Sequence, residues 1–61
     1  MTNFNLNQIV KGKNAGTFVI VGFRTVGFDD GVQVKSVNPN DHTQVASGEI
    51  FLPFDAIKAA H

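Results

Sequence analysis

The longest hydrophobic run of the chain covers residues 17–23 (Thr-Phe-Val-Ile-Val-Gly-Phe). It is rich in β-branched and aromatic side chains, which pack well on the pleated surface of a strand. A helix can also be drawn through the run, but Gly16 and Gly22 bracket it and favour the strand. Strict alternation makes both faces apolar, with Phe18 and Ile20 on one and Val19, Val21 and Phe23 on the other. Because both faces of such a strand must be buried, we predict that it is the central strand of a small barrel or sandwich.

Shorter patterns on either side predict three more strands. Residues 8–11 form the first, and residues 43–52 contain the last, with a break or bulge at residues 47–48. Residues 31–38 alternate, with Val32, Val34 and Ser36 on one face and Gln33, Lys35 and Val37 on the other. This alternation predicts a strand with one core face and one largely hydrated face.

Two turns and a short helix complete the pattern. The pair Asp30-Gly31 between apolar runs predicts a tight hairpin, and residues 38–42 form a second turn around Pro39. Residues 53–60 begin with a proline, followed by an acid and then a lysine, which predicts a helix of one or two turns packing Phe54 and Ile57 on the core. The whole resembles a mainly β, small SH3-like barrel of four to five antiparallel strands with a short C-terminal helix. We expect one domain over residues 1–61.

Composition limits how such a domain is stabilised. A chain of 61 residues has a small core, because proteins of this size bury only about 60% of their unfolded surface. The sequence has no cysteine, which excludes disulfides and cysteine-bound zinc. We expect no cofactor and no structural metal, so that tight packing or self-association must stabilise the fold.

Charge and hydropathy narrow the location and the partners. Five basic and five acidic residues give a formal net charge of zero, which provides no overall attraction to nucleic acid or anionic membranes. The chain has no apolar stretch long enough to span a bilayer, and residues 1–6 lack the pattern of a signal peptide. We therefore expect a cytoplasmic protein without a membrane partner.

No group of residues predicts catalysis or metal binding. Asp29, Asp30 and Asp41 lack the spacing of a calcium loop, and His42 beside Asp41 has no nucleophile near it in sequence. The glycine- and lysine-containing loop at residues 11–16 lacks the ending of a phosphate-binding P-loop. We therefore expect a protein that is not an enzyme.

Basic residues near aromatic ones leave nucleic-acid binding as an alternative. Phe23 and Phe28 could stack on bases beside the positive charges. The neutral chain and the acids at Asp29 and Asp30 argue against this, and six phenylalanines without a polar group are typical of core packing. The residues that this alternative requires on one face are Lys11, Lys13, Arg24 and Lys35.

A charged residue within an apolar strand leads to the favoured function. Glu49 shares a face with Phe51 and opposes Ile50. It either keeps an edge strand from pairing with other chains or forms a charged contact within a partner surface. We expect a non-enzymatic module that binds a protein partner or itself, as an accessory or inhibitory factor. Its expected surface consists of Phe28, Lys35, Glu49 and Phe51.

The order of short motifs resembles a known family. Residues 20–23 (Ile-Val-Gly-Phe), 34–36 (Val-Lys-Ser) and 50–51 (Ile-Phe), followed by Pro53, Ala56 and Ile57, are similar to the type II plasmid-encoded dihydrofolate reductases. Members of that family are short SH3-like barrels that form tetramers around a pore for folate and a nicotinamide cofactor. Their pore strand reads Gln-Ile-Tyr-Pro, whereas this chain has Glu49, Ile50, Phe51 and an extra Leu52 before the proline. The resemblance therefore implies the fold and self-association, with the reductase activity as a second alternative.

Overall fold

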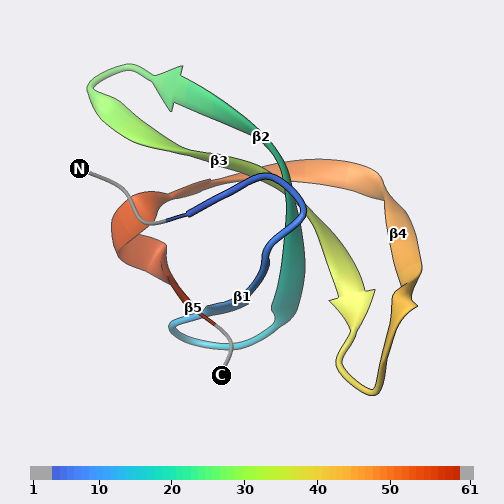
Figure 1. Cartoon of the computed structure of the whole chain (residues 1–61). Helices are drawn as coiled ribbons and strands as arrows, with labels where there is room; N and C mark the ends of the chain where they lie inside the picture. Colours follow the sequence, from blue (N-terminus) through green and yellow to red (C-terminus); the bar gives the residue numbers. More distant parts are fainter. Residues whose placement is uncertain (1–3, 60–61) are drawn as a thin grey trace.

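The protein folds as one five-stranded antiparallel sheet with the strand order β4-β3-β2-β1-β5 (Figure 1). The computed structural model describes residues 4–59. The elements are β1 (Ile9–Gly12), β2 (Thr17–Val26), β3 (Asp29–Asn38), β4 (Asp41–Pro53), a 3₁₀ helix η1 (Phe54–Ala56) and β5 (Ile57–Ala59). The strongly curved sheet is not closed, because β4 and β5 form its two edges. The mainly β fold of four to five antiparallel strands is thus confirmed.

The apolar strand β2 occupies the centre of the sheet, as its sequence predicts. It pairs with β1 on one side and β3 on the other, and Ile20 is fully buried. A register shift between Ile20 and Gly22 interrupts its pairing with β3. Beyond this bulge Phe23 lies opposite Val32, a core residue, so the predicted placement of Phe23 on the face opposite Ile20 is wrong. The extra residue in the bulged strand reverses the alternation.

The core lies on one face of the sheet, which we call the inner face. Its fully or almost fully buried residues are Val10, Ile20, Val32, Val34 and Ile57, with Phe4, Phe18, Leu52 and Phe54 packed against them. Each such aliphatic side chain contributes about 1.5–3 kcal/mol when buried. The opposite, outer face of β3 is only partly hydrated, because Val37 is also buried there, opposite Val45. Val21, at the bulge, is more than one third exposed, so β2 is not covered along its whole length.

The turn between β2 and β3 differs from the predicted one by three residues. It consists of Gly27 and Phe28, and Gly27 has a φ of 63°. Glycine at the first central position is typical of a type II′ hairpin turn. The predicted turn residues Asp30 and Gly31 instead lie within β3. Gly31 is buried where it pairs with Pro53 of β4, and a Cβ atom at this position would clash with the carbonyl oxygen of Leu52.

Of the predicted C-terminal helix over residues 53–60, only a single 3₁₀ turn is present, and the helical prediction beyond Ala56 is wrong. A single 3₁₀ turn is followed by β5, which pairs with β1 and places Ile57 opposite Gly12. A helix of eight residues is marginal by itself, whereas the strand satisfies its backbone by pairing and buries Ile57. The expected packing of Phe54 and Ile57 on the core is confirmed. Residue 60, at the end of the predicted helix, lies outside the described residues.

Strand β4 forms a long edge with a bend. Its pairing with β3 shifts register between Lys35 and Val37, which lie opposite Glu49 and Val45. The shift confirms the bulge predicted at residues 47–48. Figure 1 shows β4 bending before it runs across the molecule, below the β2–β3 hairpin, toward η1.

Replacing Gly31 with alanine tests the close approach of β4 to β3 at the Gly31–Pro53 pair. We expect Gly31→Ala to lower the free energy of unfolding by about 2–3 kcal/mol, because overpacking forces backbone shifts. The Cβ atom would meet the backbone of Leu52 and Pro53 and the ring of Phe51, at 2.3, 2.7 and 2.8 Å. Urea denaturation measures the difference. Gly48→Ala is the control, since its Cβ meets nothing within 4 Å and we expect a change below about 0.5 kcal/mol. Equal stability of the two variants would contradict this close approach.

Candidate functional site

The β2–β3 hairpin carries an unusual share of the exposed hydrophobic surface. Figure 1 shows this hairpin projecting from the rest of the sheet. Of the seven large hydrophobic residues that are exposed within residues 4–59, the hairpin beyond the bulge holds Phe23, Val26 and Phe28. Phe28 is fully exposed at the turn. We call this part of the hairpin, residues 23–31, the hairpin arm.

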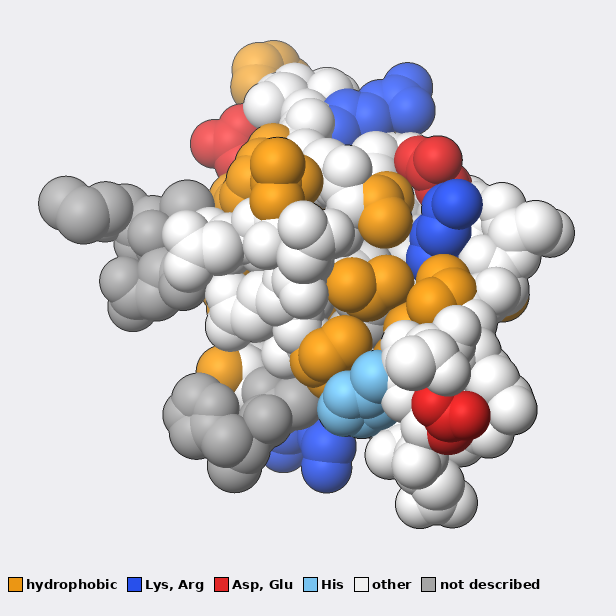
Figure 2. Space-filling model, turned by 45° about the vertical axis from the view of Figure 1, so that its right-hand side comes forward, with side chains coloured by type: hydrophobic (Ala, Val, Ile, Leu, Met, Phe, Trp, Pro, Cys, Tyr) orange, Lys and Arg blue, Asp and Glu red, His pale blue; other side chains and the backbone are white. Residues whose placement is uncertain are grey.

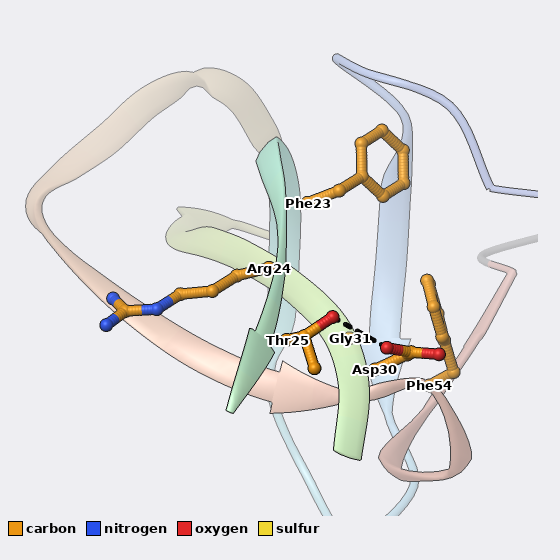
Figure 3. Close-up of a pocket in the computed structure, with 6 residues that line it drawn as sticks. All are labelled: Phe23, Arg24, Thr25, Asp30, Gly31 and Phe54. Carbon is orange, nitrogen blue, oxygen red and sulfur yellow. Dashed lines mark hydrogen bonds between the residues drawn. The ribbon is translucent and has the colours of Figure 1, made fainter. Parts of the chain in front are cut away.

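An aromatic hollow lies at the base of the hairpin arm. It has a volume of about 330 Å³ and is lined by Phe23, Arg24, Thr25, Asp30, Gly31 and Phe54 (Figure 3). The ring centroids of Phe23 and Phe54 are 6.5 Å apart, with the ring planes tilted by 43°. Phe4 stacks on Phe54 with a centroid distance of 5.9 Å and nearly parallel planes. Because the sheet is open here, Phe23 keeps 48% of its surface exposed.

The hollow has one acidic and one basic lining residue, Asp30 and Arg24, which differ in orientation. Thr25 and Asp30 lie opposite each other in the hairpin, on the same face as Phe23. The Thr25 hydroxyl donates a hydrogen bond of 2.6 Å to Oδ1 of Asp30, which orients the carboxylate. Asp30 and Phe54 line the same hollow, and Figure 3 shows the guanidinium of Arg24 pointing away from the rings. Within the described part of the chain, Asp30 forms no ion pair and its Oδ2 has no hydrogen-bond partner.

The residues expected to form one partner surface lie at two places. Lys35 lies opposite Glu49, and Phe51 lies opposite Gln33, so that these side chains share the outer face beside Val45. Phe28 lies five residues along β3 from Gln33, a separation of about 16 Å in an extended strand. We call Lys35, Glu49, Phe51, Val37 and Val45 the outer patch. Figure 2, turned toward β4, shows hydrophobic side chains gathered in the middle of the view, with charged ones around them.

The outer patch adjoins one polar atom that lacks a partner. Oε1 of Gln33 is buried and accepts no hydrogen bond from any residue within 4–59. An unsatisfied buried polar atom destabilises a fold by about 1–3 kcal/mol. The atom is covered in this structure, so it offers no direct contact to a partner.

The four basic residues of the nucleic-acid alternative lie on different parts of the sheet. Lys11 lies between Thr17 of β2 and Lys58 of β5, while Arg24 lies in the hairpin arm. Thr17 and Arg24 are seven residues apart in β2, about 23 Å along the strand. Lys13 follows β1, and its amide donates a hydrogen bond to Ala56. The fourth residue, Lys35, lies in the outer patch. These four residues therefore form no continuous basic track, and nucleic-acid binding stays a prediction.

Asp41 has a structural role in the β3–β4 turn. Its Oδ1 accepts hydrogen bonds from the hydroxyl and the amide of Thr43, at 2.6 and 3.1 Å. The Thr43 hydroxyl is the main cause that lowers the pKa of Asp41, followed by the Thr43 amide, with a smaller contribution from His42. Nowhere in residues 4–59 do three or more His, Asp or Glu side chains gather in a way that could hold a metal ion.

Comparisons with known proteins gave no match. It matches no family model, no curated protein and no solved structure. No helix within residues 4–59 has the length and apolar character needed to cross a membrane. The candidate site is therefore assigned from the residues of this chain alone.

Sequence reasoning missed the aromatic hollow because of the bulge. Strict alternation places Phe23 on the face opposite the core. The predicted turn places Asp30 in a loop, outside any strand. Gly22, inside an otherwise apolar strand, is the signal that could have revealed the irregularity, since such glycines often mark bulges. Nothing in the sequence indicated the stacking of Phe4 on Phe54.

The titration of Asp41 tests the turn. We expect carboxyl NMR signals to give a pKa below the usual aspartate value, because both Thr43 hydrogen bonds favour the ionised form. With a folded-state pKa below the unfolded one, this contribution to stability is present at neutral pH and is lost as the pH falls through the folded-state pKa. We expect Thr43→Val to raise the pKa and Thr43→Ser, which keeps the hydroxyl, to leave it low. An unchanged titration in Thr43→Val would contradict this assignment.

Proposed function

We propose that this chain is a non-enzymatic interaction module that binds a protein partner through its hairpin arm. The observation that carries the proposal is the fully exposed phenylalanine at the tip of a projecting hairpin, with exposed Val26 next to the turn. Burying one such side chain in a complex contributes about 1.5–3 kcal/mol, and aromatic anchors of this kind dominate many protein interfaces.

The balance of buried and exposed hydrophobic residues supports a partner. Within residues 4–59, six hydrophobic residues are buried and seven large ones are exposed. A chain of this size has a small hydrophobic core, and leaving large hydrophobic side chains exposed does not stabilise the monomer. A partner that covers the hairpin arm would remove three of them from water.

The sheet supports a scaffold role for the remainder of the chain. Its antiparallel order, with β1 between β2 and β5, is compatible with a small SH3-like barrel in which the edge strands β4 and β5 do not pair with each other. In our proposal the sheet holds the hairpin arm rigidly, and the whole acts as an accessory or inhibitory factor on a larger protein.

Local charge favours a protein over nucleic acid at the hairpin arm. Asp29 and Asp30 follow the exposed Phe28 directly, and Arg24 is the only basic residue of the arm. Two carboxylates beside the anchor repel phosphate groups.

The long edge of β4 is protected against pairing with a second copy. The bulge near residues 47–48 bends it, and Glu49 places a charge within its apolar part. Both features hinder edge-to-edge pairing of sheets. The proposal therefore assigns the hairpin arm to a different protein, with self-association as an outcome of the test.

Affinity capture with matched variants tests the proposed function. We expect the wild-type chain to retain a specific protein from lysate of its own cells, and Phe28→Ser to retain at least tenfold less. Leu6→Ser is the control, because Leu6 is 56% exposed but lies outside the hairpin arm. Both substitutions replace an exposed apolar side chain by serine, so we expect similar stability.

Three outcomes would overturn the proposal. These are the absence of a retained protein, equal retention by the Phe28→Ser variant, and equal loss with Leu6→Ser. Sedimentation of the purified chain covers self-association: a dimer that dissociates in Phe28→Ser would assign the hairpin arm to a second copy instead.

A further inference from the structure

We infer that the aromatic hollow receives the guanidinium group of an arginine side chain from a bound peptide segment. This inference rests on the proposed function, because it specifies the chemistry of the protein partner. It depends on three features of the hollow: its aromatic rings, its carboxylate and its size.

The rings provide a surface for a flat cation. Phe23 comes from β2 and Phe54 from η1, with ring centroids 6.5 Å apart. Cations bind over aromatic faces within about 6 Å of the ring centroid, so a guanidinium seated over one ring lies within reach of the other. Phe4 stacks on Phe54 and supports this ring from a third segment of the chain. Phe23 is half exposed and accessible to a ligand.

The carboxylate is oriented in advance. Oδ1 of Asp30 accepts the hydrogen bond from Thr25, which leaves Oδ2 available for a donor from the ligand. A hydrogen bond between a guanidinium and a carboxylate is about twice as strong as one between neutral groups. Because Thr25 already restricts the carboxylate, binding loses little side-chain entropy at this position.

The surrounding charges favour a cation. Asp55 follows Phe54 in η1 and is exposed, so the segment that carries this ring has a negative charge as well. Arg24 also lines the hollow, but its guanidinium points away from the two rings in Figure 3 and therefore does not cover them. No ion pair neutralises Asp30 within the described residues.

The size of the hollow suits one side chain. A volume of about 330 Å³ is at the lower end of the 300–1,000 Å³ that is usual for ligand pockets. Arginine fits better than lysine, because its planar and weakly hydrated guanidinium stacks on aromatic rings. The exposed Phe28 would then supply apolar contact at the tip, and the hollow would select the charged residue.

A titration with a defined peptide tests the inference. The probe is acetyl-Ala-Ala-Arg-Ala-Ala-amide, added at millimolar concentration to the ¹⁵N-labelled chain. We expect amide shifts at Phe23, Thr25, Asp30, Gly31 and Phe54. The same peptide with citrulline, which has the shape of arginine without its charge, should bind about tenfold more weakly. Raising the salt concentration should weaken only the arginine peptide.

Two neighbouring aspartates provide a matched pair of variants. Asp30→Asn removes the charge but keeps an oxygen that can accept the Thr25 hydrogen bond, and we expect about tenfold weaker binding. Asp29→Asn removes a charge from the outer face, since residue 29 alternates with residue 30, and we expect at most a twofold change. Phe23→Leu should also weaken binding of arginine more than that of citrulline, because it removes the aromatic face. Unchanged amide spectra away from the hollow establish that each variant is folded.

The inference is overturned by the absence of shifts in the hollow, by equal affinity for the two peptides, or by equal effects of the two aspartate variants. These results are separate from those for the proposed function. Capture of a partner that depends on Phe28 but not on Asp30 would overturn the arginine assignment alone. Arginine binding in the hollow without Phe28-dependent capture would overturn the role of the hairpin tip and leave the hollow as a peptide site.

Discussion

The bulge in β2 between Ile20 and Gly22 is the constraint on which the rest of the structure depends. Before it, β2 contributes Phe18 and Ile20 to the core, as a regular strand would. After it, the alternation is reversed, so Phe23 points to the inner face at the point where the core is already ending. A regular strand would have buried one set of side chains and exposed the other along its whole length. The bulge instead divides β2 into a core segment and a segment that forms the hairpin arm.

The close approach of β4 to Gly31 completes the aromatic hollow. Because Gly31 has no side chain, β4 can pass near enough for Leu52 to pack on the core and for η1 to follow immediately. This brings Phe54 to the ring of Phe23, although the two residues are far apart in sequence. The hollow is therefore a product of three segments: the hairpin arm, η1 and the residue Phe4 that stacks on η1.

The thin core and the exposed surface follow from the same shortage of chain. A single open sheet has two faces, and 61 residues supply cover for little more than one of them. The outer face is partly covered by its own side chains, as at Val37, while Val45 and Val21 remain exposed. On the inner face the open side leaves Ile50 at 46% exposure. The chain protects its long β4 edge with a bend and a charge, so the hairpin arm is the exposed surface best suited to a partner.

The sequence by itself determined the strand-rich fold, the central position of β2, the edge bulge in β4 and the packing of Phe54 and Ile57. These features depend on local composition and on periodicity, which alternation and β-branching make visible. Only the tertiary structure decided where the alternation is reversed, which glycine forms the turn, and that residues 57–59 pair with β1 instead of continuing a helix. Each of these results from contacts between distant segments: Gly31 permits the close approach of β4, and Ile57 is buried beside β1. The aromatic hollow belongs to the same class, because its rings and its carboxylate meet only when the sheet curves.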